Sequence, residues 1–263
     1  LTQYAGQGIT VNEIKSIILQ LKSLSSSDLY ESNKTFLKML SDGFILKRED
    51  RNQKDIYIQL INYAGLNRHR QPEEGEVISI AAEPEAQYPP DTNIYKFVNQ
   101  LEIVGTEKRI PDGIIYINGL PLVVIELKNA IDENADVKAA FNQLQTYKQL
   151  IPSLFTYNAF LIVSDGWFAK GGTLSSDYSR FMEWKTADGV NIVNTQTEPE
   201  MEPMIKGLLN KKTLLDVVRH FIVYEKTKEK TIKKIAAYHQ YYAVNKAIAK
   251  TIEATTSNEE DKK

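Results

Sequence analysis

Hydrophobic residues near the N-terminus recur at the spacing of an amphipathic helix. In "ITVNEIKSIILQLKSL" they follow one another three or four residues apart behind Thr10 and Glu13, which form the pattern of a helix-capping box. The segment "DLYESNKTFLKMLSDG" repeats this spacing and ends at Gly43, a residue type that often terminates helices. The pattern therefore predicts two N-terminal helices, followed by short strands in "FILKR" and "DIYIQLINY".

The middle of the chain changes from alternating to helical spacing and back again. Strand patterns are dense from "NIYKFVNQLEIVG" to Lys128, and the helical pattern of "NADVKAAFNQLQTYKQLIP" follows, with Asn134 as its expected cap. The apolar segment "YNAFLIVSDG" then indicates another strand. A helix between two strands that can be neighbours predicts an α/β fold with a helix crossing over the sheet.

Further helices are predicted toward the C-terminus. "MEPMIKGLLN", "KTLLDVVRHFIVYE" and "IAAYHQYYAVNKAIAKTIE" have helical spacing, and Thr213 is the expected cap of the second. The basic "KTKEKTIKK" is expected to be a solvated connector, and the tail "TTSNEEDKK" is polar. Residues 65–91 are rich in Pro, Gly and Glu and are expected to form a loop around the short apolar piece "VISIAA".

Composition limits the chemistry available to the chain. It is 42% hydrophobic and 25% charged, which is ordinary for a globular protein, and it has no run of apolar residues long enough to cross a membrane. It has no cysteine and three scattered histidines, so a metal ion would be held by oxygen ligands. The net charge of −2 neither favours nor excludes binding to nucleic acid.

Two charges, Glu126 and Lys128, interrupt the end of the apolar strand "LPLVVIEL". Both point to the same face of a strand, and an edge strand with one face in water would explain them. The strand is apolar on both faces up to Glu126, however, which is typical of a strand covered on both sides. A carboxylate there is costly without a partner, so a cation or a metal ion is expected nearby.

The strand before it can supply a second carboxylate, Asp112 in "RIPDGIIYING". A two-residue loop at Asn118 and Gly119 would leave Asp112 on the face opposite Glu126. We therefore predict a three-residue loop with a bulge at Gly119, or another loop or bulge of the same parity, which pairs Asp112 with Val124. Asp112 and Glu126 would then share a face and could together hold Mg²⁺.

The spacing of Pro111, Asp112, Glu126 and Lys128 resembles the PD-(D/E)xK nuclease motif. The sequence around it, in "EKRIPDGIIYINGLPLVVIELKNA" and "AFNQLQTYKQLIPSLFTYNAFLIVSDG", resembles the restriction (R) subunit of type I restriction-modification enzymes. The resemblance extends from "ESNKTFLKMLSDG" to "YHQYYAVNKAI" and is weakest in residues 65–91. It implies a nuclease-like mixed β-sheet flanked by α-helices, with additional C-terminal helices.

The resemblance also implies roles for individual residues. Phosphodiester hydrolysis needs an activated water and neutralised charge. Asp112, Glu126 and the Leu127 carbonyl would hold Mg²⁺, with Mn²⁺ as a substitute, and Lys128 would orient or deprotonate the water. Gln143 and Tyr147 match an accessory Q-x-x-x-Y motif of these nucleases, although Tyr147 could instead extend the apolar stripe of its helix.

Contacts with DNA are harder to predict. Lys108, Arg109, Lys138 and Lys148 flank the expected site in sequence and are weak candidates, because most such charges are solvated surface residues. Relatives often carry an acidic residue on an upstream helix, and Glu31 is a poor substitute for it. Toward the C-terminus, Gln240 resembles a glutamine that contacts adenine in helicase-type motors, so ATP would be a ligand only of a longer protein.

The resemblance implies an endonuclease domain at residues 1–230, with its core at about 93–170, and a connector and the start of a truncated motor domain at 231–263. The domain would cut double-stranded DNA non-specifically in the cytoplasm. The methyltransferase (M) and specificity (S) subunits would be its partners, and the full complex would supply target recognition and ATP-driven translocation. Two alternatives are a docking domain without activity and a repair or recombination nuclease of the same fold.

Overall fold

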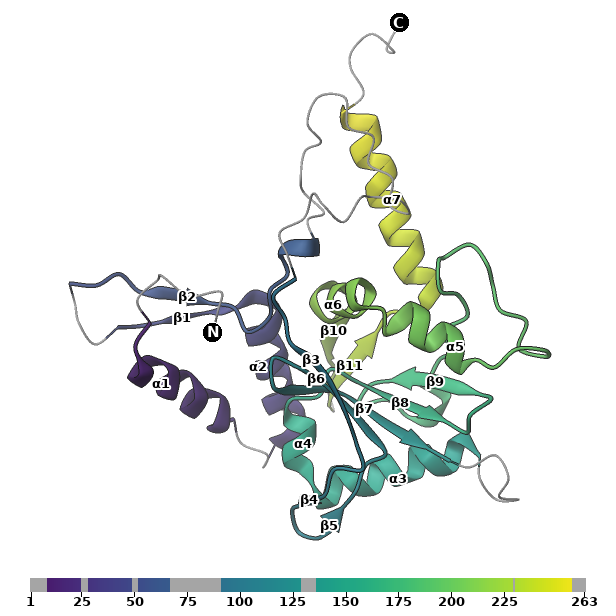
Figure 1. Ribbon diagram of the computed structural model, residues 1–263, viewed down its shortest axis with the longest axis horizontal. Coiled ribbons are helices and arrows are strands. Elements are labelled where there is room, and N and C mark those ends of the chain that lie inside the picture. The colour runs from purple at the N-terminus through teal and green to yellow at the C-terminus, as the bar shows by residue number, and fades with distance from the viewer. Residues whose placement is uncertain are drawn as a thin grey trace, which may run out of the picture.

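A five-stranded mixed sheet forms the centre of this computed structural model, which describes residues 9–24, 28–48, 52–66, 91–128, 136–228 and 230–256 (Figure 1). The strand order is β3-β6-β7-β8-β9, with only β7 and β8 parallel to each other. The strands are β3 (Tyr95–Asn99), β6 (Gly113–Ile117), β7 (Leu120–Leu127), β8 (Phe160–Ser164) and β9 (Ala169–Gly172). The predicted α/β fold with a mixed sheet is confirmed.

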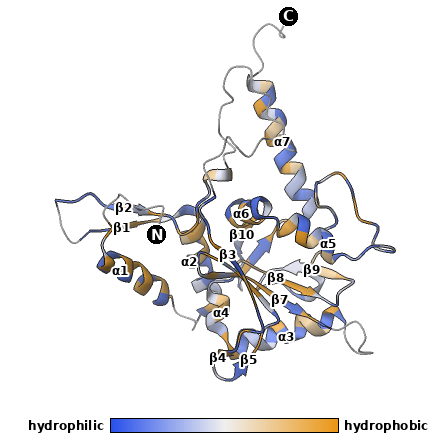
Figure 2. Ribbon diagram, viewed as in Figure 1, coloured by the Kyte–Doolittle hydropathy of each residue, from blue (hydrophilic) through white to orange (hydrophobic). Residues whose placement is uncertain are grey.

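Each face of the sheet is covered by helices. On one face, α3 (Val137–Leu150) and α4 (Pro152–Thr156) pack against a buried row that includes Val124 and Val163. On the other, α2 (Leu29–Asp42) and α6 (Lys211–His220) pack against a row that includes Val123 and Ile125. Side chains alternate between faces along a strand, so β7 is apolar on both faces because both are covered. Figure 2 shows the resulting hydrophobic colouring of the central strands.

The helix α3 connects the parallel strands β7 and β8, as predicted for a crossover. Its cap within the described residues is Asp136, whose side chain accepts from the Ala139 N–H at 2.6 Å. The predicted cap, Asn134, lies outside the described residues. The helix ends at Leu150, and Pro152 then begins α4, where a proline costs no backbone hydrogen bond.

The N-terminal segment forms a small layer beside the sheet (Figure 1). Its elements are α1 (Val11–Lys22), β1 (Phe44–Leu46) and β2 (Ile56–Ile58), and the capping box of Thr10 and Glu13 is present. The Arg48 Nε lies 3.0 Å from the Glu13 carboxylate and ties the strand end to the helix start. Both predicted helices and both predicted strands of this segment are therefore confirmed, whereas "VISIAA" lies outside the described residues.

Shorter elements complete the fold. The strands β4 (Ile103–Val104) and β5 (Lys108–Arg109) form a small hairpin, and the segment around α5 (Met201–Pro203) continues as a π-helix at Met204–Leu208. Single 3-10 turns lie at Ala64–Leu66 and Tyr178–Arg180. The last helix, α7 (Tyr238–Thr256), is present as predicted and rises away from the sheet in Figure 1. Among the residues described, no helix is both long and apolar enough to span a membrane.

Predictions for two segments in the second half of the chain are wrong, and one strand was not predicted. The segment after β8 contains the strand β9, whose two glycines weaken the sequence pattern. The helix α6 is capped by Asn210 instead of Thr213 and ends at His220, so "FIVYE" forms β10 (Ile222–Lys226). The "KTKEKTIKK" segment is not a solvated connector, because it continues into β11 (Thr231–Ile235), which pairs with β10.

A buried polar network explains why this basic segment folds back onto the domain. Lys233 is 1% exposed, and its Nζ donates to Asn33 Oδ1 at 2.9 Å and to the Asn158 carbonyl at 2.7 Å. Burial holds the pKa of Lys233 well below its usual range. The predicted domain boundary at residue 230 falls in the turn of the β10–β11 hairpin, and the motor domain beyond it stays a prediction.

Candidate active site

The hairpin that carries the site has a different register from the predicted one. Asn118 and Gly119 have φ angles of 53° and 85°, and Ile117 pairs with Leu120, so the loop has two residues. The predicted three-residue loop is wrong, because Asn-Gly fits the two-residue turn with positive φ at both positions. A bulge follows at once, where the pairing shifts between Ile115 and Tyr116. Pro121 lies at this shift, and it has no N–H to donate to the ladder.

The bulge restores the parity that the three-residue loop was expected to provide. On the far side of the bulge from the turn, Ile114 pairs with Val124 and Gly113 with Ile125. Continuing this register by one residue places Asp112 opposite Glu126. The Asp112 side chain reaches across, and its Oδ2 accepts from the Leu127 N–H at 2.8 Å. The predicted proximity of the two carboxylates is confirmed, although it is produced by a bulge within the strand.

A residue that the sequence did not single out fixes the other oxygen of Asp112. Gln100 Nε2 donates to Asp112 Oδ1 at 2.8 Å, and the Gln100 N–H donates to the Asp112 carbonyl at 3.3 Å. Gln100 has a φ of 52°, uncommon for a residue other than glycine, just after β3. No local pattern in the sequence marks it, because the contact depends on how β3 pairs with β6.

Glu126 is buried with one carboxylate oxygen unsatisfied. Its side chain is 0% exposed; Oε1 lies 3.3 Å from Lys128 Nζ, and Oε2 has no hydrogen-bond partner in the part of the chain that the structure describes. Burial and, to a lesser extent, the Asp112 carboxylate raise the pKa of Glu126 to about 7, against the opposing effect of the Lys128 ammonium. A buried, unpaired carboxylate oxygen is what a bound cation would satisfy.

Lys128 is held by side chains from α3. Its Nζ donates to Gln143 Oε1, the Gln143 amide donates to the Tyr147 hydroxyl, and that hydroxyl donates to the Ile110 carbonyl at 3.3 Å. Burial raises the pKa of Tyr147, whose ring lies in the core beneath α3. Tyr147 therefore extends the apolar stripe, and its hydroxyl also joins the hydrogen-bond network. Its role as an accessory residue of the site stays a prediction.

The donors fit a hard divalent cation. Asp112 and Glu126 come from adjacent strands and meet at one end of the sheet, with the Leu127 backbone between Glu126 and Lys128. Carboxylate and carbonyl oxygens are the ligands that Mg²⁺ prefers, and it commonly takes only one or two carboxylates from a protein. No group of three or more His, Cys, Asp or Glu side chains suited to a metal ion occurs among the residues described. The Leu127 carbonyl as a ligand stays a prediction.

The four basic residues predicted as weak DNA contacts occupy different settings. Lys108 lies 3.1 Å from Glu102 and Arg109 lies 2.5 Å from Glu107, so both are ion-paired in the β4–β5 hairpin. Lys148 donates to the Leu174 carbonyl at 2.7 Å, and burial lowers its pKa to about 8. Lys138 is exposed in the first turn of α3. DNA binding by these four residues stays a prediction.

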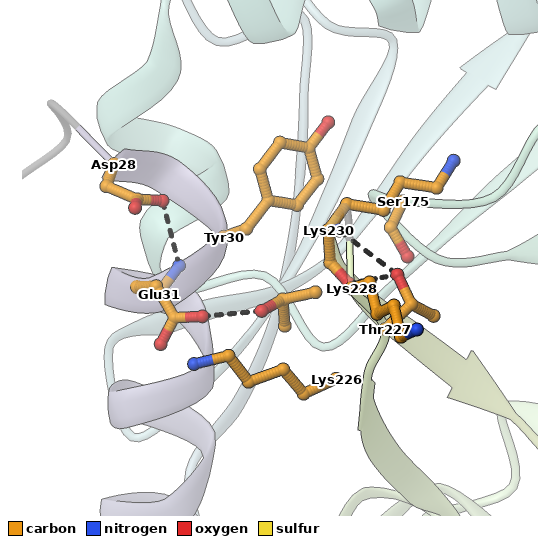
Figure 3. A pocket seen from close by; sticks show the side chains of 9 residues that line it. Asp28, Tyr30, Glu31, Ser175, Lys226, Thr227, Lys228 and Lys230 are labelled. Atoms are coloured by element: carbon orange, nitrogen blue, oxygen red, sulfur yellow. Dashed lines mark hydrogen bonds between the residues drawn. The ribbon is translucent and has the colours of Figure 1, made fainter.

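A separate cavity of about 430 Å³ opens between the start of α2 and the β10–β11 turn (Figure 3). It includes Ser175, which lies beyond the end of β9 farthest from Glu126. Figure 3 shows Glu31 directed into it, and Glu31 Oε1 accepts from the Thr231 hydroxyl at 2.5 Å. Glu31 is therefore no ligand of the Asp112–Glu126 site. The lining residues are Asp28, Tyr30, Glu31, Ser175, Lys226, Thr227, Lys228, Lys230 and Thr231.

Gln240 forms a hydrogen bond at the start of its own helix, α7. Its Oε1 accepts from the Ala237 N–H at 2.9 Å at the start of α7. Beside it Tyr241 packs against Trp184 and Phe221 in the hydrophobic core. The predicted contact of Gln240 with adenine stays a prediction.

Comparison with known proteins identifies the family. The family model described as type I restriction enzyme R protein N terminus matches residues 3–180. The type I restriction enzyme HindI endonuclease subunit of Haemophilus influenzae is 39% identical over 248 residues, which are 92% of this chain and 21% of that protein. The putative type I restriction enzyme MjaIXP endonuclease subunit of Methanocaldococcus jannaschii is 28% identical over 253 residues, 90% of this chain and 22% of that protein.

The chain spans about a fifth of the length of these two relatives. The match of the family model covers the whole Asp112–Tyr147 network, and the similarity to the first relative extends over nearly all of the chain. By both measures, the chain belongs to the family of type I restriction enzyme R protein N-terminal domains.

Proposed function

We propose that this chain is a metal-dependent endonuclease domain that hydrolyses phosphodiester bonds of double-stranded DNA, with Mg²⁺ as its cofactor and Mn²⁺ as a substitute. The observation that carries the proposal is the meeting of Asp112, Glu126 and Lys128 at one end of the sheet. The names of the relatives, which are endonuclease subunits of type I restriction enzymes, support it.

The residues divide the reaction between them. Asp112 and Glu126 would hold the ion, which would polarise the phosphate and neutralise developing charge. Lys128 would orient the attacking water and offset negative charge on the phosphate as the bond breaks. Gln143 and Tyr147 would act on Lys128: the hydrogen bonds from Lys128 to Gln143 and from Gln143 to Tyr147 fix the direction of its Nζ.

The remaining functions are assigned to a longer protein and its complex. Since the chain spans about a fifth of its relatives, we assign ATP binding, including any contact of Gln240 with adenine, to a full-length subunit. Target recognition would come from the S subunit and modification from the M subunit. Cleavage by this domain would then be non-specific in sequence and would take place in the cytoplasm.

Metal dependence of cleavage tests the proposal. The chain, alone and within a full-length subunit assembled with M and S subunits, is incubated with supercoiled plasmid in Mg²⁺, in Mn²⁺ or in a chelator. We expect nicked and linear products with either metal ion and none in the chelator, because without the ion the carboxylates of Asp112 and Glu126 would repel the phosphate and Lys128 carries only a single positive charge. Equal cleavage in the chelator, or an assembly that translocates on DNA in Mg²⁺ without cutting it, would contradict the proposal.

A further inference from the structure

The glutamine that follows β3 contacts Asp112 through both its backbone and its side chain. β3 lies next to β6 in the sheet, and its last residue, Asn99, pairs with Gly113 (Figure 1). Continuing this register by one residue places Gln100 opposite Asp112. The Gln100 N–H donates to the Asp112 carbonyl at 3.3 Å, and Gln100 Nε2 donates to Asp112 Oδ1 at 2.8 Å. None of the roles proposed for the site uses the side-chain contact.

The chemistry of a carboxylate fixes the direction of this side-chain contact. A glutamine amide has one oxygen, which accepts hydrogen bonds, and one NH₂ group, which donates them. An ionised carboxylate only accepts, so the Gln100 amide must present Nε2 to Asp112. A hydrogen bond to a charged acceptor is shorter and stronger than one between neutral groups. The Gln100 amide can therefore restrain the Asp112 carboxylate.

The Asp112 carboxylate is held from two sides. Its Oδ1 accepts from Gln100, and its Oδ2 accepts from the Leu127 N–H at 2.8 Å. Gln100 follows β3 and Leu127 ends β7, so the two donors come from the strands on either side of β6. Together they fix the plane of the carboxylate. Each carboxylate oxygen has two lone pairs, so these two bonds leave one lone pair on each oxygen for a cation.

Gln100 keeps a backbone conformation that its residue type does not favour. Among the described residues, two that are not glycine have a positive φ, Asn118 at 53° and Gln100 at 52°. Asparagine is enriched in this region, and Asn118 occupies a hairpin turn that requires it. On backbone grounds alone, glycine or asparagine would suit the place of Gln100 better than glutamine does. Residues held in such conformations cluster at functional sites.

The stability of the fold does not explain why this residue is a glutamine. Gln100 is exposed, and an exposed side chain exchanges its hydrogen bonds with water at little net gain in the free energy of unfolding. The backbone N–H that reaches the Asp112 carbonyl is present in every residue type except proline. What glutamine adds is a donor long enough to reach Asp112 Oδ1. The side chain therefore serves the carboxylate and not the fold.

We propose that Gln100 is a positioning residue of the metal site, which holds the Asp112 carboxylate in the orientation that a divalent ion needs. This inference rests on the nuclease function proposed above and adds a residue to its metal site. Groups that hydrogen-bond to a metal ligand orient it, and their loss typically weakens metal binding by about 10- to 100-fold. Mg²⁺ demands nearly ideal geometry, whereas Ca²⁺ accepts irregular sets of ligands. Loss of the Gln100 amide should therefore weaken Mg²⁺ binding more than Ca²⁺ binding.

Metal binding to two variants of Gln100 tests the proposal. Gln100→Met keeps the approximate length of the side chain and removes the donor, and Gln100→Gly removes the whole side chain and adopts the positive φ without strain. The electron paramagnetic resonance signal of free Mn²⁺ measures the affinity for Mn²⁺, and displacement of bound Mn²⁺ measures the affinities for Mg²⁺ and Ca²⁺. In both variants we expect Mn²⁺ and Mg²⁺ to bind about 10-fold more weakly, and Ca²⁺ less than about threefold more weakly.

Stability in chelator separates positioning from a structural role. Because glycine adopts a positive φ without strain, Gln100→Gly should melt at the same temperature as Gln100→Met or at a higher one. Metal affinity should nevertheless fall equally in both variants, because both lack the donor. Gln20→Met is the matched control, since Gln20 is exposed on α1 in the N-terminal layer, and its metal affinity should stay within about twofold of wild type. Asp112→Ala identifies the fraction of Mn²⁺ that binds at the site.

The outcomes separate this inference from the nuclease proposal. Wild-type metal affinity in both Gln100 variants would overturn the positioning role and leave metal-dependent cleavage untouched. Equal losses of affinity for Mg²⁺ and Ca²⁺, or a loss confined to the less stable variant, would also overturn it, because the effect would then come from the fold. A wild-type chain that binds Mn²⁺ no more tightly than Asp112→Ala would contradict the metal site itself, and both proposals with it.

Discussion

Replacing Lys128 with methionine is expected to slow DNA cleavage by about 10²- to 10⁴-fold without weakening metal binding, the range typical of a lost general acid–base group. Methionine keeps much of the length of the side chain and removes its charge. The ammonium lies between Glu126 Oε1 and Gln143 Oε1, and the backbone positions of Glu126 and Gln143 do not depend on it. The cleavage rate falls because the attacking water loses the group that orients it.

The assays for this variant are plasmid cleavage by the assembled complex and calorimetric titration of Mn²⁺ into the chain. Lys206→Met is the matched control, since Lys206 lies outside the site and pairs with Glu202 on its own exposed helical turn, at 2.5 Å. The control should cut at the wild-type rate. Wild-type cleavage by the Lys128→Met variant would show that Lys128 has no part in the chemistry.

The Glu126→Gln variant is expected to raise the melting temperature of the metal-free chain at pH 8 and to abolish stabilisation by Mn²⁺. Burial raises the pKa of Glu126 to about 7 from its usual 4.5, so the folded chain binds this proton more tightly than the unfolded chain does. Ionisation at pH 8 therefore costs stability, on the order of 1 to 3 kcal/mol. Glutamine removes that cost, which corresponds to about 2 to 8 °C.

The difference in melting temperature between wild type and the Glu126→Gln variant depends on pH. Below about pH 4.5 Glu126 is protonated in both the folded and the unfolded chain, so wild type and variant should melt at similar temperatures. The advantage of the variant should grow as the pH rises from about 4.5 to about 7 and then stay constant. Differential scanning calorimetry in chelator measures it, with the exposed Glu202→Gln as control. A variant that is less stable than wild type at pH 8 would contradict the cost of ionising the buried Glu126 carboxylate.

Much of the fold could be predicted because the relevant signals are local. The apolar stripe of α3 and the uninterrupted apolar run of β7 indicate a helix crossing over a covered sheet, and both are present. The placement of Glu126 and Lys128 on one face follows from strand geometry alone. Gln143, in contrast, was placed near these two residues by the family resemblance, and its contact with Lys128 agrees with that placement.

The rest depended on contacts between distant segments. The loop at Asn118 was predicted with one residue too many, because the bulge that corrects the parity lies within β7 and has no marker apart from Pro121. Lys233 was assigned to a solvated connector because a lysine-rich run is usually exposed, whereas here its acceptors come from Asn33 and Asn158, more than 70 residues away. Gln100 was missed for the same reason.

The most direct test of the account is whether a divalent metal ion binds between Asp112 and Glu126. Crystals of the chain and of its Asp112→Ala variant are soaked in Mn²⁺, and anomalous diffraction is collected from both. The account predicts a peak between the two carboxylates, next to the unsatisfied Glu126 Oε2, that is lost in the variant. A wild-type map without that peak, at Mn²⁺ concentrations that support cleavage, would contradict the proposal that these two residues form the metal site of a nuclease.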